Sequence, residues 1–302
     1  MPSLTRGSII NEGLVMQNSQ EEDILLAVAP LRKRIRSNKR IIVGGIIVLI
    51  FVFMGILAPF IGTDPNKINA YNILTPPNQE HPLGTDQLGR DLLARIIWGS
   101  QISLLIGILV TAASLTGGIL VGTISGYFGG YVDNVLMRVV DILLAFPPIL
   151  LAIAVVAALG PGLVNVMIAV AVWSIPSFSR LVRSVVLTVK ELDYITAAKA
   201  SGEKNFGIII HYILPNCLSP IIVQATLRIA TVILVSAALS FIGLGVQPPT
   251  PEWGVILSEG RSYIQVAPHL ITFPGAAIAV VVIGFNLLGD GLRDVFDVRL
   301  SD

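Results

Sequence analysis

Charged side chains are scarce in this sequence. Asp, Glu, Lys and Arg together supply 13% of the 302 residues, against 54% for hydrophobic residues, and the mean hydropathy is +0.80. Soluble domains carry about 25% charged residues, so the composition excludes an ordinary soluble globular domain. We therefore expect lipid, not water, to be the main solvent of the folded chain.

Residue sets that carry catalysis or bind metals are also lacking. Cys217 is the one cysteine, so no intrachain disulfide forms. His81, His211 and His269 are scattered and lack metal-ligand spacing, and no Ser, His and Asp set falls on one side of the membrane. No Gly-x-x-x-x-Gly-Lys-Ser/Thr phosphate loop is present. We expect no catalytic residue, metal site or bound cofactor, and hence no enzyme.

Long apolar runs predict an all-α, polytopic membrane protein with about six transmembrane helices, because only a helix satisfies its own backbone hydrogen bonds in lipid. The run from Ile142 to Ser179 is too long for one crossing and breaks at Gly160-Pro161-Gly162, where glycine tolerates a turn and proline ends a helix. The predicted spans are 41–61, 101–125, 135–159, 162–179, 217–246 and 270–290.

Basic residues are unevenly distributed along the chain. Six of them cluster directly before the first span: Arg32, Lys33, Arg34, Arg36, Lys39 and Arg40. Such clusters remain on the cytoplasmic side, so we expect a multi-pass protein of the cytoplasmic (inner) membrane with both termini in the cytoplasm. We interpret the cluster as a topology signal that also attracts anionic lipid, not as a nucleic-acid site. The first span is too long for a signal-peptide core, so it is expected to stay as an anchor.

This topology divides the chain into four parts. Residues 1–40 form a cytoplasmic tail that ends in the basic juxtamembrane segment, and residues 41–100 form the first transmembrane helix and an external loop. Residues 101–293 form the transmembrane core, which contains the cytoplasmic loop 180–216 and the external loop 247–269. Residues 294–302 form a cytoplasmic C-terminal tail.

Loop 180–216 predicts two short helices joined by a turn at Gly202. Its small residues, Ala197, Ala198, Ala200 and Ser201, leave a low-relief surface that another protein can approach closely. Thr196-Ala197-Ala198, Gly202 and Leu214-Pro215 resemble the Glu-Ala-Ala loop of ATP-binding-cassette (ABC) importer permeases, with Thr196 where that family has Glu. The resemblance implies a helix that couples to an ATPase through Thr196, Ala197, Ala198, Lys199, Ser201, Gly202, Glu203, Leu214 and Pro215.

Further stretches resemble the dipeptide, oligopeptide and nickel importer permeases, in particular their second permease subunit. The stretches are 81–91, 137–141, 145–147, 239–245, 247–254 and 286–294. The stretches are spread along the chain, and the resemblance covers most of residues 40–299, with Val298 in place of the expected Pro. The resemblance implies a type I ABC importer permease fold and ATP-driven import of di- or oligopeptides. It also implies partners: a homologous second permease subunit, two ABC ATPases that bind ATP and Mg, an extracytoplasmic substrate-binding protein and the lipid bilayer.

Several features inside the predicted spans are candidates for function. Gly118, Gly122 and Gly126 recur every four residues, which favours helix packing over a pore lining. Arg138 and Asp141 stand three residues apart, which predicts an interfacial ion pair.

Arg228 lies well inside a span, where an Arg costs about 2.5 to 3.5 kcal/mol on insertion scales, so it must face protein or water. We expect it to line the pathway, with structural pairing as the alternative. The external loop 247–269 either dips into the entrance as a gate or forms an aromatic belt at the interface. The candidate pathway or gate residues are Arg228, Ser240, Phe241, Gln247 and Trp253.

Other functions predict different features. An autonomous secondary transporter or channel would show inverted repeats, broken helix pairs or acidic residues at the midplane, and no acidic residue lies deep in a predicted span. A membrane-embedded enzyme or structural anchor would need a polar constellation or a dispensable 180–216 loop. Within the resembled family, nickel chelates and glutathione are the alternative cargoes.

Overall fold

The computed structural model of the chain describes residues 31–60 and 63–296. The polar start of the predicted N-terminal tail and the end of the C-terminal tail, including Val298, lie outside the described residues. The helices of the described residues are α2 (Leu31–Ser37), α3 (Lys39–Leu57), η1 (Ala58–Phe60), α4 (Leu92–Phe128), α5 (Gly130–Ala145), α6 (Pro148–Leu159), α7 (Leu163–Val189), α8 (Asp193–Ala200), α9 (Asn205–Ile208), the π-helix η2 (Ile209–Ile213), α10 (Leu214–Phe241), α11 (Trp253–Gly260), η3 (Arg261–Tyr263) and α12 (His269–Phe296).

The all-helical, polytopic prediction is confirmed. Five helical segments of the described residues are long and apolar enough to cross a membrane: Lys39–Phe60, α4, α7, Asn205–Phe241 and α12. A sixth crossing results if α5 and α6, which meet at an angle of 96°, form one bent span. The count of about six predicted from the apolar runs therefore agrees with the structure.

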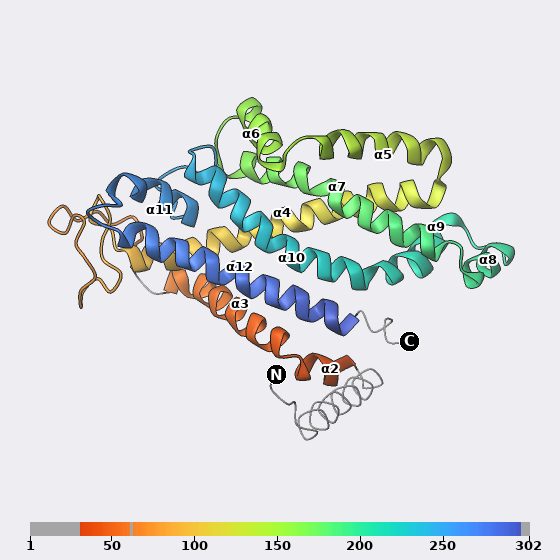
Figure 1. Cartoon of the computed structure of the whole chain (residues 1–302), viewed down its shortest axis with the longest axis horizontal. Coiled ribbons are helices and arrows are strands. Elements are labelled where there is room, and N and C mark those ends of the chain that lie inside the picture. The colour runs from red at the N-terminus through yellow and green to blue at the C-terminus, as the bar shows by residue number, and fades with distance from the viewer. Residues whose placement is uncertain (1–30, 61–62, 297–302) are drawn as a thin grey trace, which may run out of the picture.

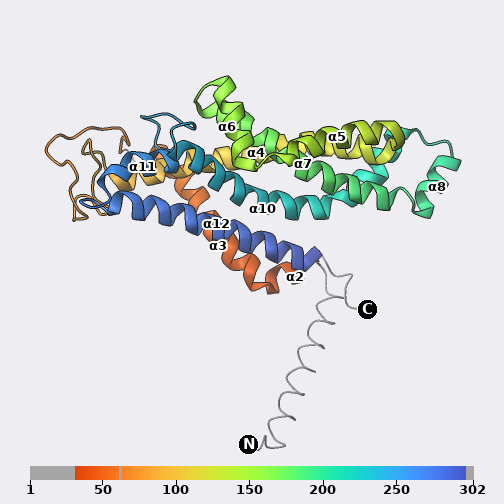
Figure 2. The same ribbon diagram turned by 45° about the horizontal axis from the view of Figure 1, so that its top comes forward.

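The long helices form an elongated bundle in which α4 and α10 lie centrally. α7 packs along α4, α12 packs against both α3 and α10, and α10 also contacts α4 and α7. Figures 1 and 2 both show the loop of residues 63–91 and α11 at one end of the bundle and α8 at the opposite end. The loop of residues 63–91 and α8 are thus separated by the full length of the membrane-spanning helices.

The predicted span 135–159 is wrong as a single straight helix. Its chain turns at Phe146-Pro147, where α5 ends and α6 begins. Proline clashes with a helical conformation of the preceding residue, and Phe146 is accordingly extended, with φ −87° and ψ 137°. The helix therefore breaks at a proline that the apolar pattern does not reveal.

The predicted boundaries that differ most from the observed helix ends are the start of α4 and the end of α7. α4 begins at Leu92 rather than at residue 101, because the Asp91 side chain caps its first turn by accepting a hydrogen bond from Ala94 N–H (2.8 Å). α7 continues to Val189 rather than ending at residue 179. The first part of the predicted loop 180–216 is therefore helical.

Ion pairs with α5 explain the longer α7. Arg180 Nη2 lies 2.6 Å from Asp141 Oδ1, and Arg183 Nη2 lies 2.5 Å from Asp133 Oδ2. These arginines therefore lie on one side of a continuing helix instead of marking its end. The partner of Asp141 is Arg180, so the predicted Arg138–Asp141 pair is replaced by a contact between two helices.

Small residues let α4 and α7 approach closely. A side chain added at Gly118 would collide with Phe178, and one at Gly126 would meet Val186 Cβ at 2.9 Å. At Gly122 the added Cβ would lie 2.6 Å from the Ser179 carbonyl oxygen and 2.8 Å from Val182 Cβ. The three glycines therefore face α7, and the backbone of that helix occupies the space beside them.

Replacing Gly122 with Val is expected to destabilise the protein. The new side chain meets backbone atoms of α7 that cannot rotate away, and overpacking of this kind costs about 1 to 3 kcal/mol. The thermal unfolding midpoint of the purified protein measures the effect. Gly45→Val in α3 is the matched control, because nothing lies within 4 Å of a Cβ at that position; an equal drop in both variants would contradict this account.

Candidate functional site

Helix α8 and the turn that follows it contain most of the residues assigned to coupling. Its last turn closes through three backbone hydrogen bonds, from Ser201 N–H to Ala197 O (2.9 Å), from Gly202 N–H to Lys199 O (3.0 Å) and from Glu203 N–H to Ala198 O (3.1 Å). Gly202 adopts a φ of +82°, a conformation that glycine reaches without a Cβ penalty. The turn therefore ends α8 sharply and directs the chain back toward the bundle.

Two apolar side chains anchor α8 to the bundle. Ile195 is fully buried and Ala198 is 9% exposed, and both belong to a cluster with Val186, Ile213 and Cys217, which come from α7, η2 and α10. Above them, Tyr127 at the end of α4 donates a hydrogen bond to Asn205 Oδ1 (2.8 Å). The helix thus sits on a shared apolar base formed by α7, η2 and α10.

This anchoring divides the predicted low-relief surface. Ala198 faces the bundle and is not available for docking, which corrects the expectation that all the small residues share one surface. The exposed face of α8 and its turn comprises Thr196, Ala197, Lys199, Ala200, Ser201, Gly202 and Glu203. Leu214 and Pro215 open α10 directly after η2, with Pro215 exposed.

The expected pathway residues separate into two groups. Trp253 is fully buried, donates a hydrogen bond from Nε1 to Ile96 O (3.0 Å) and packs edge-on against Phe51. Ser240 is also buried, and its Oγ accepts a hydrogen bond from Val246 N–H (3.2 Å). A place on a pathway or in an interfacial belt therefore does not fit these two side chains in this conformation.

Phe241, Gln247 and Arg228 are the remaining candidates. Phe241 and Gln247 are exposed, and Gln247 Nε2 donates to the carbonyl oxygens of Gly243 (3.2 Å) and Gly245 (2.9 Å). Arg228 is half-buried in the middle of α10, where it faces two aromatic rings of α7. The structure does not bring these three together into one site.

A buried carboxyl lies beside Trp253. Glu252 caps α11 by accepting a hydrogen bond from Val255 N–H (3.1 Å), and Ser103 Oγ of α4 lies 3.4 Å from it. Burial raises the pKa of Glu252, and the hydrogen bonds to Gly254, Ser240, Val255 and Ser103 only partly oppose this. The carboxyl links α4, α10 and α11 at the end of the bundle that carries the loop of residues 63–91.

A buried cluster of four charged side chains holds the loop of residues 63–91 in place. Asp86 Oδ2 accepts hydrogen bonds from Arg90 Nε and Arg95 Nη1, each at 2.6 Å. Glu259 of α11 lies 3.0 Å from Arg90 Nη2 and 2.8 Å from Arg95 Nη2. Two arginines and two carboxylates therefore balance in charge and connect the loop, α4 and α11.

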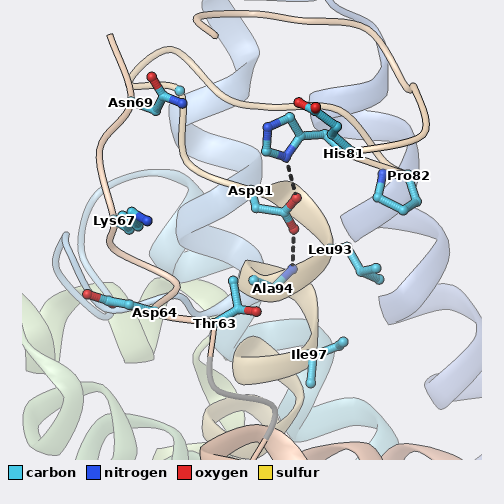
Figure 3. A pocket seen from close by; sticks show the side chains of 12 residues that line it. Thr63, Asp64, Lys67, Asn69, His81, Pro82, Asp91, Leu93, Ala94 and Ile97 are labelled. Atoms are coloured by element: carbon cyan, nitrogen blue, oxygen red, sulfur yellow. Dashed lines mark hydrogen bonds and ion pairs between the residues drawn. The ribbon is translucent and has the colours of Figure 1, made fainter. Parts of the chain in front are cut away.

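The outer face of the same loop carries a pocket of about 330 Å³. Figure 3 shows that His81 and Asp91 in its lining point toward each other and are joined directly, with His81 Nδ1 2.7 Å from Asp91 Oδ2. Lys67 and Asp64 lie on its other side. The pocket thus combines both signs of charge at the end of the bundle opposite α8.

Sequence reasoning missed the buried carboxyl of Glu252 and the buried ion pairs of Asp86 and Glu259 with Arg90 and Arg95. Asp86 and Arg90 stand four residues apart, a spacing that signals pairing, but Glu259 lies 169 residues from Arg90. Nothing in the local pattern distinguishes Glu252 and Glu259 from exposed loop carboxylates, because their burial depends on how α11 packs against α4, α10 and α12.

Replacing Asp86 with Ala is expected to destabilise the protein, because it leaves Arg90 and Arg95 buried with one carboxylate between them. Breaking a buried pair in this way costs about 3 to 5 kcal/mol. Thermal unfolding of the purified protein checks the loss, and Glu80→Gln, at an exposed carboxylate of the same loop, serves as the control. A midpoint unchanged by Asp86→Ala would contradict the assigned role.

Stability is also expected to depend on pH through Glu252. Its pKa is higher in the folded chain than the ordinary value of 4.5, so the folded state holds the proton more tightly and this stability is lost as the pH rises through the raised pKa. Glu252→Gln should therefore flatten the fall of the unfolding midpoint as the pH rises above 4.5. An undiminished fall in the variant would show that another group is responsible.

Comparisons with known proteins match almost the whole chain. The family described as the binding-protein-dependent transport system inner membrane component matches residues 118–302, and the N-terminal TM domain of oligopeptide transport permease C matches residues 31–77. The dipeptide transport system permease protein DppC of Alkalihalophilus pseudofirmus is 49% identical, over 93% of each chain. The glutathione transport system permease protein GsiD of Pectobacterium atrosepticum is 44% identical, over 86% of this chain and 87% of that protein.

A solved structure supports the same fold. The inward-facing MetNI methionine ABC transporter matches with a TM-score of 0.56 and 20% identity, over 69% of this chain and 98% of the matched chain. The described residues thus have the ABC importer permease fold, and the expectation of a non-catalytic transport subunit is confirmed by the family. This chain belongs to the multi-pass inner-membrane permease components of binding-protein-dependent ABC transporters, with the N-terminal domain of the permease C type.

Proposed function

We propose that this chain forms half of the translocation pathway of an ATP-driven importer of di- and oligopeptides. The relatives of highest identity reported above support this cargo, because the 49% identical protein is a dipeptide permease. Its partners are a homologous second permease subunit, two ABC ATPases that bind ATP and Mg, and an extracytoplasmic substrate-binding protein. Glutathione is the second candidate cargo, favoured by the 44% identity to GsiD.

We place α8 and both termini in the cytoplasm and the loop of residues 63–91 outside. The basic residues of α2 and the start of α3 support this orientation. In this arrangement the ATPase contacts the exposed face of α8, and the binding protein delivers cargo at the opposite end, near α11 and the pocket of His81 and Asp91.

The observation that carries the proposal is the shape of α8. Its exposed face carries small residues beside the charged Lys199 and Glu203 at the tip of the bundle, while Ile195 and Ala198 tie it to α7 and α10. A helix held in this way transmits displacement instead of bending, because packed interiors are stiff. ATP-dependent motion of the partner would therefore reach the two long helices directly.

Enlarging the exposed face of α8 is expected to uncouple transport. Ala197→Trp should lower peptide uptake into proteoliposomes that contain the complete transporter about tenfold or more, because the indole prevents close approach of the ATPase. The ATPase activity that the loaded binding protein stimulates should fall in parallel, and the yield of inserted chain should remain unchanged.

Ala197→Ser is the matched control, because it preserves the low relief of the surface and should transport like the wild type. Normal uptake by Ala197→Trp at equal protein levels would refute docking at this face. Uptake by the permease pair without ATPases would refute the proposed function itself.

A further inference from the structure

Arg228 has unusual surroundings in the middle of α10. Its guanidinium carbon lies 5.3 Å from the ring centre of Trp173 and 6.0 Å from that of Phe178, both on α7. Both aromatic side chains are buried, and the two helices pack against each other. The rings therefore form an aromatic cradle, here the pair Trp173 and Phe178, that holds the guanidinium by cation–π attraction.

No carboxylate of the described residues pairs with Arg228. By contrast, Arg90 and Arg95 pair with Asp86 at the loop end, and Arg183 pairs with Asp133 on the far side of α7. The Nε atom of Arg228 is buried without a hydrogen-bond partner, although the side chain as a whole is only half-buried. A charge at mid-span must face protein or water, and a carboxylate partner for Arg228 would have to come from outside the described residues.

The geometry selects a carboxylate as that partner. Aromatic contacts engage the flat faces of a guanidinium, whereas its N–H groups project in the plane and match the two oxygens of a carboxylate. Every unmodified peptide ends in a carboxylate, whatever its side chains. A single arginine can therefore bind peptides of many sequences through the group they share.

Open space approaches Arg228 along α10. A pocket of about 410 Å³ between α7, α10 and α12 is lined by Leu181, Ser219, Gln224 and Leu227, among others. Gln224 stands four residues before Arg228, and residues at that spacing share one face of a helix. Arg228 itself does not line the pocket, which therefore ends about one helical turn from position 228 of α10, on the α8 side of the bundle.

We propose that Arg228, held by the Trp173 and Phe178 cradle, binds the terminal carboxylate of the transported peptide as it passes through the membrane. The inference rests on the proposed peptide-import function, and it assigns to one residue the recognition of a chemical group common to the cargo.

The test uses the complete transporter in proteoliposomes, with dialanine and its C-terminal amide as cargoes, each supplied at a concentration that saturates the binding protein. Arg228→Gln should lower the uptake rate of dialanine about tenfold and leave that of the amide unchanged. Trp173→Leu should reduce dialanine uptake in the same selective way, whereas Trp173→Phe, which keeps a ring, should remain close to wild type. Arg261→Gln, which removes an exposed guanidinium, is the matched control.

Three results would overturn the inference. Equal slowing of both cargoes would indicate a structural role, and unchanged dialanine uptake would exclude any role in binding. If neutralising a carboxylate of the second permease subunit restored dialanine uptake to Arg228→Gln, the partner of Arg228 would be that fixed carboxylate and not the peptide.

Two controls distinguish the loss of carboxylate binding from failed assembly of a variant and from a wrong cargo assignment. If Arg228→Gln loses the ATP hydrolysis that the binding protein stimulates, the variant has not assembled. The comparison of dialanine uptake by Trp173→Leu and Trp173→Phe then decides whether the aromatic cradle acts in peptide binding. If the wild-type transporter hydrolyses ATP in response to the binding protein but imports neither cargo, the proposed peptide cargo is wrong, and this inference falls with it.

Discussion

The close contact between α4 and α7 is the interaction on which the rest of the structure depends. Without a side chain at Gly118, Gly122 or Gly126, the backbone of α7 approaches α4 directly. In lipid there is no hydrophobic drive between helices, so such close packing must supply the attraction. α7 in turn carries the rings that face Arg228 and part of the apolar base of α8, so its position fixes both.

Charge is distributed differently at the two ends of the bundle. At the loop end, two arginines and two carboxylates are buried together and lock the loop of residues 63–91 onto α4 and α11. At the α8 end, charged side chains such as Lys199 and Glu203 are exposed around a small-residue surface. The first arrangement is suited to a rigid platform and the second to a surface that a partner covers and releases.

Much of the fold follows from the sequence. Apolar runs locate the membrane-spanning segments, and Gly160-Pro161-Gly162 marks the hairpin between α6 and α7. The helix ends were less predictable, since α4 begins at a cap from Asp91 and α7 continues because its arginines pair with α5. The bend at Pro147 was also hidden, because the residues on both sides of it are apolar and continue the same run.

The sequence predicts where the candidate coupling helix lies, but not which of its side chains face the bundle. The spacing of Thr196, Gly202 and Leu214-Pro215 located the short helix α8, but only packing decides that Ala198 faces inward and Ala197 outward. Trp253 was misplaced for the same reason, since a tryptophan beside several prolines in a loop gives no sign of burial. Contacts such as Arg90 with Glu259, 169 residues apart, depend on tertiary structure alone.

The apolar base beneath α8 joins the helix that carries the aromatic cradle to the helix that carries Arg228. α7 carries Trp173 and Phe178, α10 carries Arg228, and both helices contribute side chains to that base. Phe178 is 6.0 Å from the guanidinium, at the outer limit of cation–π attraction. A shear of α10 along α7 away from Phe178 by one residue's rise, about 1.5 Å, would therefore end the contact with that ring and leave Trp173 as the remaining aromatic partner.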